Sequence, residues 1–196
     1  MNFNLIYESF FQILKGLGTS LEIIFLSLML GLILSIFIVI MRLSKNMALN
    51  TFSRSFVFVI RGTPLLVQIY FIYYGLAQFP AVRDSIVWIV LKEPFWCGVL
   101  ALTINTAAYT SEIIRSGLNS IIKGQIESAT AFGMTKFMAF KRILLPQAIR
   151  QSIPAYSNEI ILMIKASSLV SIITIMEMTG IARKIISKTF APIEVF

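Results

Sequence analysis

The sequence has no histidine and only one cysteine, Cys97, among its 196 residues. Without histidine, neither a Ser/His nor a Cys/His catalytic arrangement can form, and one cysteine supplies neither a disulfide nor a zinc cluster. Asp84 is the only aspartate, which also excludes a pair of intramembrane aspartates. These absences argue against an enzyme and against a metal site, and Cys97 is interpreted as a small apolar residue within a helix.

Charge is also scarce, since charged residues make up 13% of the chain and hydrophobic residues 57%. A soluble domain rarely exceeds half apolar content, so this composition indicates an integral membrane protein of one domain. The formal net charge of +8 could indicate nucleic acid. However, the basic residues flank apolar runs, where they act as topology signals and as contacts for anionic lipid headgroups. We therefore expect membrane lipid, and no nucleic acid, among the partners.

Four apolar stretches are long enough to cross a hydrocarbon core of about 30 Å, which needs about 20 helical residues. They are residues 18–41, 55–79, 95–114 and 152–175. The second is interrupted at RGTP, where we expect Thr63 to cap a new helical segment with Pro64 in its first turn. Residues 1–16 have apolar residues at helical spacing and are predicted to form an amphipathic helix on the membrane surface. The fold class is therefore an all-α polytopic membrane protein, with one transmembrane domain over residues 1–196.

The basic residues predict the orientation. The connections after the first and third stretches are rich in lysine and arginine, whereas the charges after the second stretch cancel. By the positive-inside rule the first and third connections are cytoplasmic and the N-terminus lies outside. The tail, with Arg183, Lys184 and Lys188 against Glu177 and Glu194, should then be outside, in mild conflict with the rule. The sequence stops where a fifth span could begin, and we expect that span to be missing.

A short basic segment, residues 118–146, lies between the third and fourth stretches. Residues 123–132 are predicted to form a helix that Gly133 ends, and residues 136–143 a second helix capped by Thr135 and stopped by Pro146. Such a pair would present aromatic residues beside basic groups, namely Phe132, Phe137 and Phe140. This surface suits a groove on another protein, or it rests on lipid headgroups.

Polar residues within two of the stretches are candidates for a binding site, because their desolvation must be offset. Asn105, Tyr109 and Glu112 share one helical face. A second stripe of the same kind in the fourth stretch consists of Ser152, Tyr156, Glu159 and Met163. Two facing stripes would line a cavity. Its predicted substrate-binding residues are Glu159, Asn105, Tyr109, Tyr156, Met163 and Ser167.

Glu159 is the central residue of this hypothesis, because it lies well inside a span with no partner nearby in sequence. An anionic group in a cavity suits a cationic ligand. Alternatively, Glu159 pairs with Arg61 or Lys165 and holds the helices together. Two further roles stay open: Glu112 is a gate or a packing partner of Arg115, and the hydroxyls of residues 165–168 satisfy backbone groups or reach a substrate carboxylate.

The spacing Glu127-Ser128-Ala129, three residues, Gly133, nine residues, Ile143-Leu144-Leu145-Pro146 resembles the EAA motif of ATP-binding-cassette (ABC) importer permeases. Ser128 in place of alanine is the one departure. In that family the segment forms coupling helices that dock in a groove of a cytoplasmic ATPase. The resemblance implies these docking residues: Glu127, Ser128, Ala129, Phe132, Gly133, Phe137, Ile143, Leu145 and Pro146.

Other stretches resemble the polar amino acid uptake permeases, including those for histidine, lysine, arginine and ornithine. They are RGTPLLVQ, NTAAYTSEIIRSG, LPQAIRQSIPAYSNE and IKASSLVSII. The resemblance implies the type I importer permease fold, with five spans in a bacterial inner membrane. It also implies a second permease chain (a copy or a paralogue), two ATPase subunits and an extracytoplasmic binding protein. The sequence has no phosphate-binding loop of the form G-x-x-x-x-G-K-S/T, so ATP and magnesium are expected on the ATPase and no cofactor on this chain.

The sequence therefore predicts a transport subunit of an importer for polar, basic amino acids. A neutral polar substrate such as glutamine is the alternative within the same class. A secondary transporter, from a different class, would predict inverted repeats and intramembrane charges on more helices, neither of which is clear in this sequence.

Overall fold

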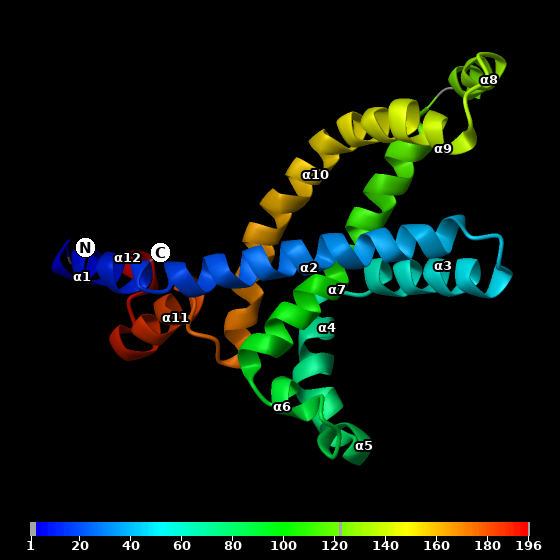
Figure 1. The fold of residues 1–196 in the computed structure, drawn as a ribbon. Helices are drawn as coiled ribbons and strands as arrows, with labels where there is room; N and C mark the ends of the chain where they lie inside the picture. Colours follow the sequence, from blue (N-terminus) through cyan, green and yellow to red (C-terminus); the bar gives the residue numbers. More distant parts are fainter. Residues whose placement is uncertain (1–2, 122, 196) are drawn as a thin grey trace.

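The computed structural model describes residues 3–121 and 123–195, and every regular element in these ranges is helical (Figure 1). The α-helices are α1 (Phe3–Leu14), α2 (Leu17–Leu43), α3 (Met47–Gly62), α4 (Leu65–Tyr70), α5 (Pro80–Arg83), α6 (Trp88–Leu91), α7 (Pro94–Asn119), α8 (Lys123–Ala131), α9 (Lys136–Ala139), α10 (Leu145–Ser167), α11 (Met178–Thr189) and α12 (Pro192–Val195). Tighter or wider helical turns extend α4 to Gln78, join α9 to α10, and extend α10 to Ile173.

Three continuous helical stretches are long and apolar enough to cross a membrane: Phe3–Leu43, Pro94–Asn119 and Lys136–Ile173. A fourth span results if α3 and the helical residues Leu65–Gln78, which meet at a bend of 106°, are taken together. The predicted all-α, polytopic architecture is confirmed. Because α1 runs on into α2 over 41 residues, or about 60 Å at 1.5 Å per residue, this stretch is longer than a bilayer core. The position of residues 1–16 on a membrane surface stays a prediction.

Helix α7 is the centre of the molecule, since it contacts α2, α3, α4 and α10. Small residues allow this close packing. A methyl group added at Gly31 of α2 would lie 2.2 Å from the Thr106 side chain of α7, and Ala101, Ala107 and Ala108 are fully buried. The helices that carry the predicted polar stripes, α7 and α10, consequently lie directly against each other.

The break after α3 differs from the prediction. Thr63 does not cap α4: its hydroxyl donates to the carbonyl of Val59, 2.9 Å away in the last turn of α3. The reason is Pro64, which forces the preceding residue into an extended conformation and so ends α3 at Gly62. Gln68 bridges the break, because its amide donates to the carbonyls of Ile60 at 2.7 Å and Thr63 at 3.1 Å.

The segment between α7 and α10 forms the first predicted short helix, α8, whereas the second, α9, continues into α10. Gly133, at φ +74°, has the left-handed backbone that ends α8, and the Thr135 hydroxyl accepts a hydrogen bond from the Met138 N–H at the start of α9. The predicted stop at Pro146 is wrong, because the chain stays helical from Lys136 to Ile173. A π-helical turn, Phe140–Leu144, precedes the proline, which then lies in the first turn of α10, where its missing N–H is tolerated.

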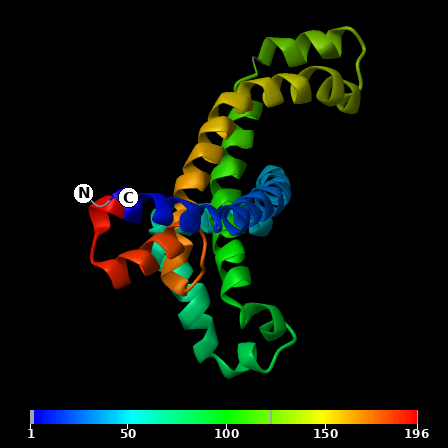
Figure 2. The same ribbon diagram turned by 90° about the vertical axis from the view of Figure 1, so that its left-hand side faces the viewer.

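Helix α11 lies beside α1 at the opposite end of the molecule from α8 and α9 (Figures 1 and 2). The buried carboxylate of Glu177 caps it, accepting hydrogen bonds from the N–H groups of Thr179 and Gly180 at 2.9 and 2.8 Å. The Ser20 hydroxyl of α2 donates to the same carboxylate at 3.4 Å. Glu177, which the sequence shows only as a charge in the tail, thus ties α11 to α2.

Candidate substrate site and coupling surface

Glu159 lies on α10 with 6% of its surface exposed, facing α7. Its Oε1 accepts a hydrogen bond from the Thr106 hydroxyl at 2.9 Å. The two ion pairs found in the described residues both belong to Glu112, so Glu159 pairs with neither Arg61 nor Lys165 there. A buried carboxylate that has one neutral partner remains poorly compensated.

Thr106 was not among the predicted site residues, although its neighbour Asn105 was. Threonine is common where membrane helices pack together, so by itself it does not indicate a binding site. Asn105 is half-buried and points elsewhere: its amide donates to the Gln68 side-chain oxygen at 3.1 Å. Asn105 and Gln68 therefore connect α7 to the break after α3.

The other α10 residues of the predicted site differ in their surroundings. Tyr156 is half-buried, whereas Met163 and Ser167 are buried at 2% and 5% exposure, with Met163 in the main apolar core. The Ser167 hydroxyl donates to the Ile164 carbonyl at 2.8 Å, which favours the backbone role over the carboxylate role. A substrate contact at Met163 or Ser167 stays a prediction, and it would require this packing to open.

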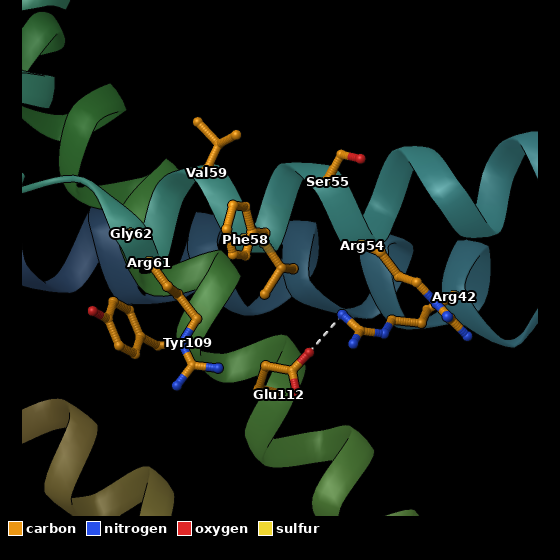
Figure 3. A pocket seen from close by; sticks show the side chains of 10 residues that line it. Arg42, Arg54, Ser55, Phe58, Val59, Arg61, Gly62, Tyr109 and Glu112 are labelled. Carbon is orange, nitrogen blue, oxygen red and sulfur yellow. Dashed lines mark ion pairs between the residues drawn. The ribbon is translucent and has the colours of Figure 1, made fainter.

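Tyr109 and Glu112 line a cavity of about 840 Å³ between α2, α3 and α7 (Figure 3). Its other lining residues are Arg42, Arg54, Ser55, Val57, Phe58, Val59, Arg61 and Gly62. A second cavity, of about 420 Å³, lies between α7 and α10 and includes Ser152. Both predicted stripes thus line the smaller cavity, through Tyr109, Glu112 and Ser152, whereas α3 instead of α10 supplies much of the lining of the larger one.

Of the two roles left open for Glu112, the structure shows the contact with Arg115, whose guanidinium donates hydrogen bonds of 3.0 and 2.7 Å to the carboxylate. Arg42, from the last turn of α2, forms an ion pair with the other carboxylate oxygen at 2.6 Å. This second partner was missed, because Arg42 is 70 residues away in sequence and was interpreted only as a topology signal. Glu112 thereby joins α2 to α7 through Arg42, while Arg115 binds it within α7.

At the other end, two aromatic side chains extend from α8 and α9: Phe132 is 85% exposed and Phe137 is 74% exposed. We call the exposed residues of positions 124–146 the coupling surface. Five more of the predicted docking residues are exposed on it: Glu127, Ser128, Gly133, Leu145 and Pro146. Ala129 is only 2% exposed and Ile143 is half-buried, so these two hold the helices together at the base of a hollow of about 420 Å³.

Polar groups between long apolar helices, together with a protruding helix pair, are features expected of a transport permease. The chain belongs to the family described as binding-protein-dependent transport system inner membrane component, whose model matches residues 27–191.

Three relatives are permease proteins. The nopaline transport system permease protein NocM of Agrobacterium fabrum is 51% identical over 197 residues, covering 100% of this chain and 82% of that protein. The octopine transport system permease protein OccM of Rhizobium meliloti is 50% identical, over 97% of this chain and 78% of that protein. The arginine ABC transporter permease protein ArtM of Escherichia coli K12 is 38% identical, over 94% of this chain and 83% of that protein.

The fold also matches a solved structure, the crystal structure of an amino acid ABC transporter with histidines. The TM-score is 0.88 at 36% identity, covering 100% of this chain and 87% of that chain. The chain is therefore a permease subunit of an amino acid ABC importer, a multi-pass inner-membrane protein that works with a separate ATPase, a binding protein and a second permease. The family predicted from the EAA-like motif is confirmed.

Proposed function

We propose that this permease carries basic amino acids of the histidine, lysine, arginine and ornithine type. The observation that carries the proposal is Glu159, a buried carboxylate whose one hydrogen-bonding partner among the described residues is the neutral Thr106. A substrate ammonium or guanidinium group would supply the missing charge. The names of the relatives, which refer to arginine, nopaline and octopine transport, support a substrate of this class.

In this proposal Glu159 binds the substrate cation. The other contributing residues are Asn105, Tyr109, Tyr156, Met163 and Ser167. Met163 and Ser167 are buried here, so they would reach a substrate only when α10 moves away from its neighbours.

The coupling surface docks on the ATPase in the cytoplasm, and the N-terminus lies outside. Support comes from the aromatic pair Phe132 and Phe137 and from the long helices that flank the segment. Helix α7 precedes α8 in the chain, and α10 belongs to a continuous helical stretch that begins at Lys136. A displacement of the coupling surface would therefore move the helices that carry Glu112 and Glu159. ATP and magnesium bind to the two ATPase subunits, and this chain binds no cofactor. The second permease is a paralogue or a copy.

A neutral polar amino acid such as glutamine is the second candidate. The amide pair Asn105 and Gln68 favours it, since these side chains could exchange hydrogen bonds with a neutral amide. This alternative differs from the main proposal only in the role of Glu159.

The test uses the complete assembly, reconstituted with its ATPase and binding protein, and labelled arginine, histidine and glutamine. Glu159→Gln keeps the size and the hydrogen bond of the side chain but removes its charge. We expect arginine uptake to fall at least about tenfold, the loss of one charge-assisted contact. Unchanged arginine uptake would make Glu159 structural. Glutamine as the one substrate of the wild type would support the second candidate.

A further inference from the structure

Arg61 is a cation that the proposed function does not use, and its side chain is exposed in this chain. It lies in the last turn of α3, 14 residues after Met47, or about 21 Å along the helix at 1.5 Å per residue. An arginine this far along a helix within a span is costly unless it faces water or a partner. Such residues commonly belong to a transport path.

Among the described residues, Arg61 has no direct ion-pair partner, although the carboxylates of Glu112 and Glu159 attract its charge from beyond contact distance. Its guanidinium carbon lies 5.0 Å from the centre of the Tyr109 ring, and Figure 3 shows the side chain passing that ring away from α3. A ring face holds a guanidinium in place by a cation–π contact. Within residues 3–121 and 123–195, no ion pair includes Arg61, and Glu112 nearby is already bound to Arg42 and Arg115.

Arg61, Tyr109 and Glu112 line both cavities, so one polar surface continues from α3 to α10. On α10 this surface includes Ser152, which lies seven residues, or two helical turns, before Glu159. The larger cavity, about 840 Å³, is within the range of small-molecule sites. Arg54 also lines the larger cavity and adds a second positive charge to the wall that carries Arg61.

We propose that Arg61 binds the α-carboxylate of the transported amino acid at a second station, between Glu159 and the coupling surface. This inference rests on the proposed function. A guanidinium presents two parallel N–H donors to a carboxylate, and the Tyr109 ring orients them. The first station would recognise the side-chain cation of the substrate and the second its α-carboxylate, so at each station one charged group of the substrate faces a protein group of opposite charge.

A phosphate group has the same anionic chemistry, and a phospholipid is the other source of such a ligand. Phe58 and Val59, which line the same cavity, are exposed apolar residues that acyl chains could contact. Arg61 lies in the last turn of α3, beside the break in the span and far from the start of the helix. This position favours the soluble amino acid, because a lipid headgroup stays near the membrane surface.

The test is equilibrium binding of labelled arginine to the complete detergent-solubilised assembly, with argininamide as competitor. Argininamide keeps the side chain and the α-amine but lacks the carboxylate. We expect the wild type to prefer arginine and Arg61→Gln to lose about tenfold of that preference. Arg61→Lys should retain part of it, and Arg83→Gln, an exposed residue of α5, should retain all of it. Co-purification with the ATPase checks that each variant assembles.

An Arg61→Gln assembly with an unchanged preference would overturn the inference. An equal loss of arginine and argininamide binding would also overturn it, since Arg61 would then be structural. If instead a phospholipid that co-purifies with the wild type is lost from Arg61→Gln while the preference stays, the cavity holds a lipid phosphate. Tyr109→Leu removes the ring but keeps Arg61, and it should lower the preference for arginine over argininamide. This variant tests the inference if Arg61→Gln does not assemble.

The wild-type uptake assay distinguishes a failure of the Arg61 inference from a failure of the proposed function. If the wild type carries a different amino acid, that amino acid and its α-amide replace arginine and argininamide. If the wild type carries none, the proposed function fails irrespective of the Arg61 variants.

Discussion

Glu159 and Phe132 both occupy surroundings that are uncommon for their chemical type. The Glu159 carboxylate is 6% exposed between two membrane helices, whereas the Phe132 ring is 85% exposed at the end of the molecule. A buried carboxylate lacks a cation, and an exposed ring lacks an apolar cover. Each position has a free energy cost within this chain that a partner would remove: a substrate in the first case, a protein groove in the second.

The two regions differ in the kind of substitution that would disrupt them. The environment of Glu159 depends on close packing between α2, α7 and α10, so it should respond to changes in helix spacing. The coupling surface depends on exposed side chains, so it should respond to changes that leave the fold intact. Three predictions make this difference measurable.

The largest effect is expected for Phe132→Asp. Central aromatic residues of protein interfaces contribute about 2–4 kcal/mol, so we expect the affinity for the ATPase to fall roughly 30-fold or more, with an unchanged melting temperature of the permease. Co-purification and titration with the ATPase measure this. Phe190→Asp is the matched control, because Phe190 is 86% exposed at the end of α11, beside α1 and away from the coupling surface. Equal losses for both variants would contradict a docking role of Phe132.

A smaller effect is expected for Gly31→Ala. The added methyl group would lie 2.2 Å from the Thr106 side chain, so either α2 and α7 separate or the Thr106 side chain turns away, at a cost of about 1–3 kcal/mol. The melting temperature should fall and arginine uptake with it, because Thr106 holds Glu159. Gly18→Ala, in the same helix with open space around the new methyl group, should be neutral or stabilising. An unchanged melting temperature in Gly31→Ala would show that this helix contact is loose.

The smallest effect is expected for Thr106→Val, which removes the hydroxyl that donates to Glu159 at nearly constant volume. The loss of one hydrogen bond costs about 1 kcal/mol. If Thr106 orients Glu159 for the substrate, the affinity for arginine should fall about fivefold. Thr110→Val, one turn further along α7, is the control, since the buried Thr110 hydroxyl has no hydrogen-bond partner in the described part of the chain. If the two valine variants bind arginine equally well, Thr106 does not orient Glu159.

Much of the coupling surface was predictable, because its structure is local. Gly133 ends α8 and Thr135 caps α9 through interactions within a few residues. Pro146 was misinterpreted because a proline is a stop in the interior of an α-helix, and the π-helical turn that places it at the start of α10 has no simple sequence signal.

The surroundings of Glu159 were less predictable, because they join residues far apart in the chain. The helical period placed Glu159 and Asn105 on inward faces, but it could not identify Thr106, which is 53 residues from Glu159, as the hydrogen-bond donor. It also could not show that Gln68 crosses the break after α3, or that Arg61 lies on Tyr109.

By itself, the sequence determined the membrane class, the apolar stretches and the short helices of the coupling surface. These follow from composition, periodicity and backbone preferences, which act over a few residues. Only the tertiary structure decided which polar groups meet: Glu159 with Thr106, Glu112 with Arg42, and Arg61 with the Tyr109 ring. The physical reason is that helix packing sets the distances between side chains, and packing depends on the small residues of all the helices at once.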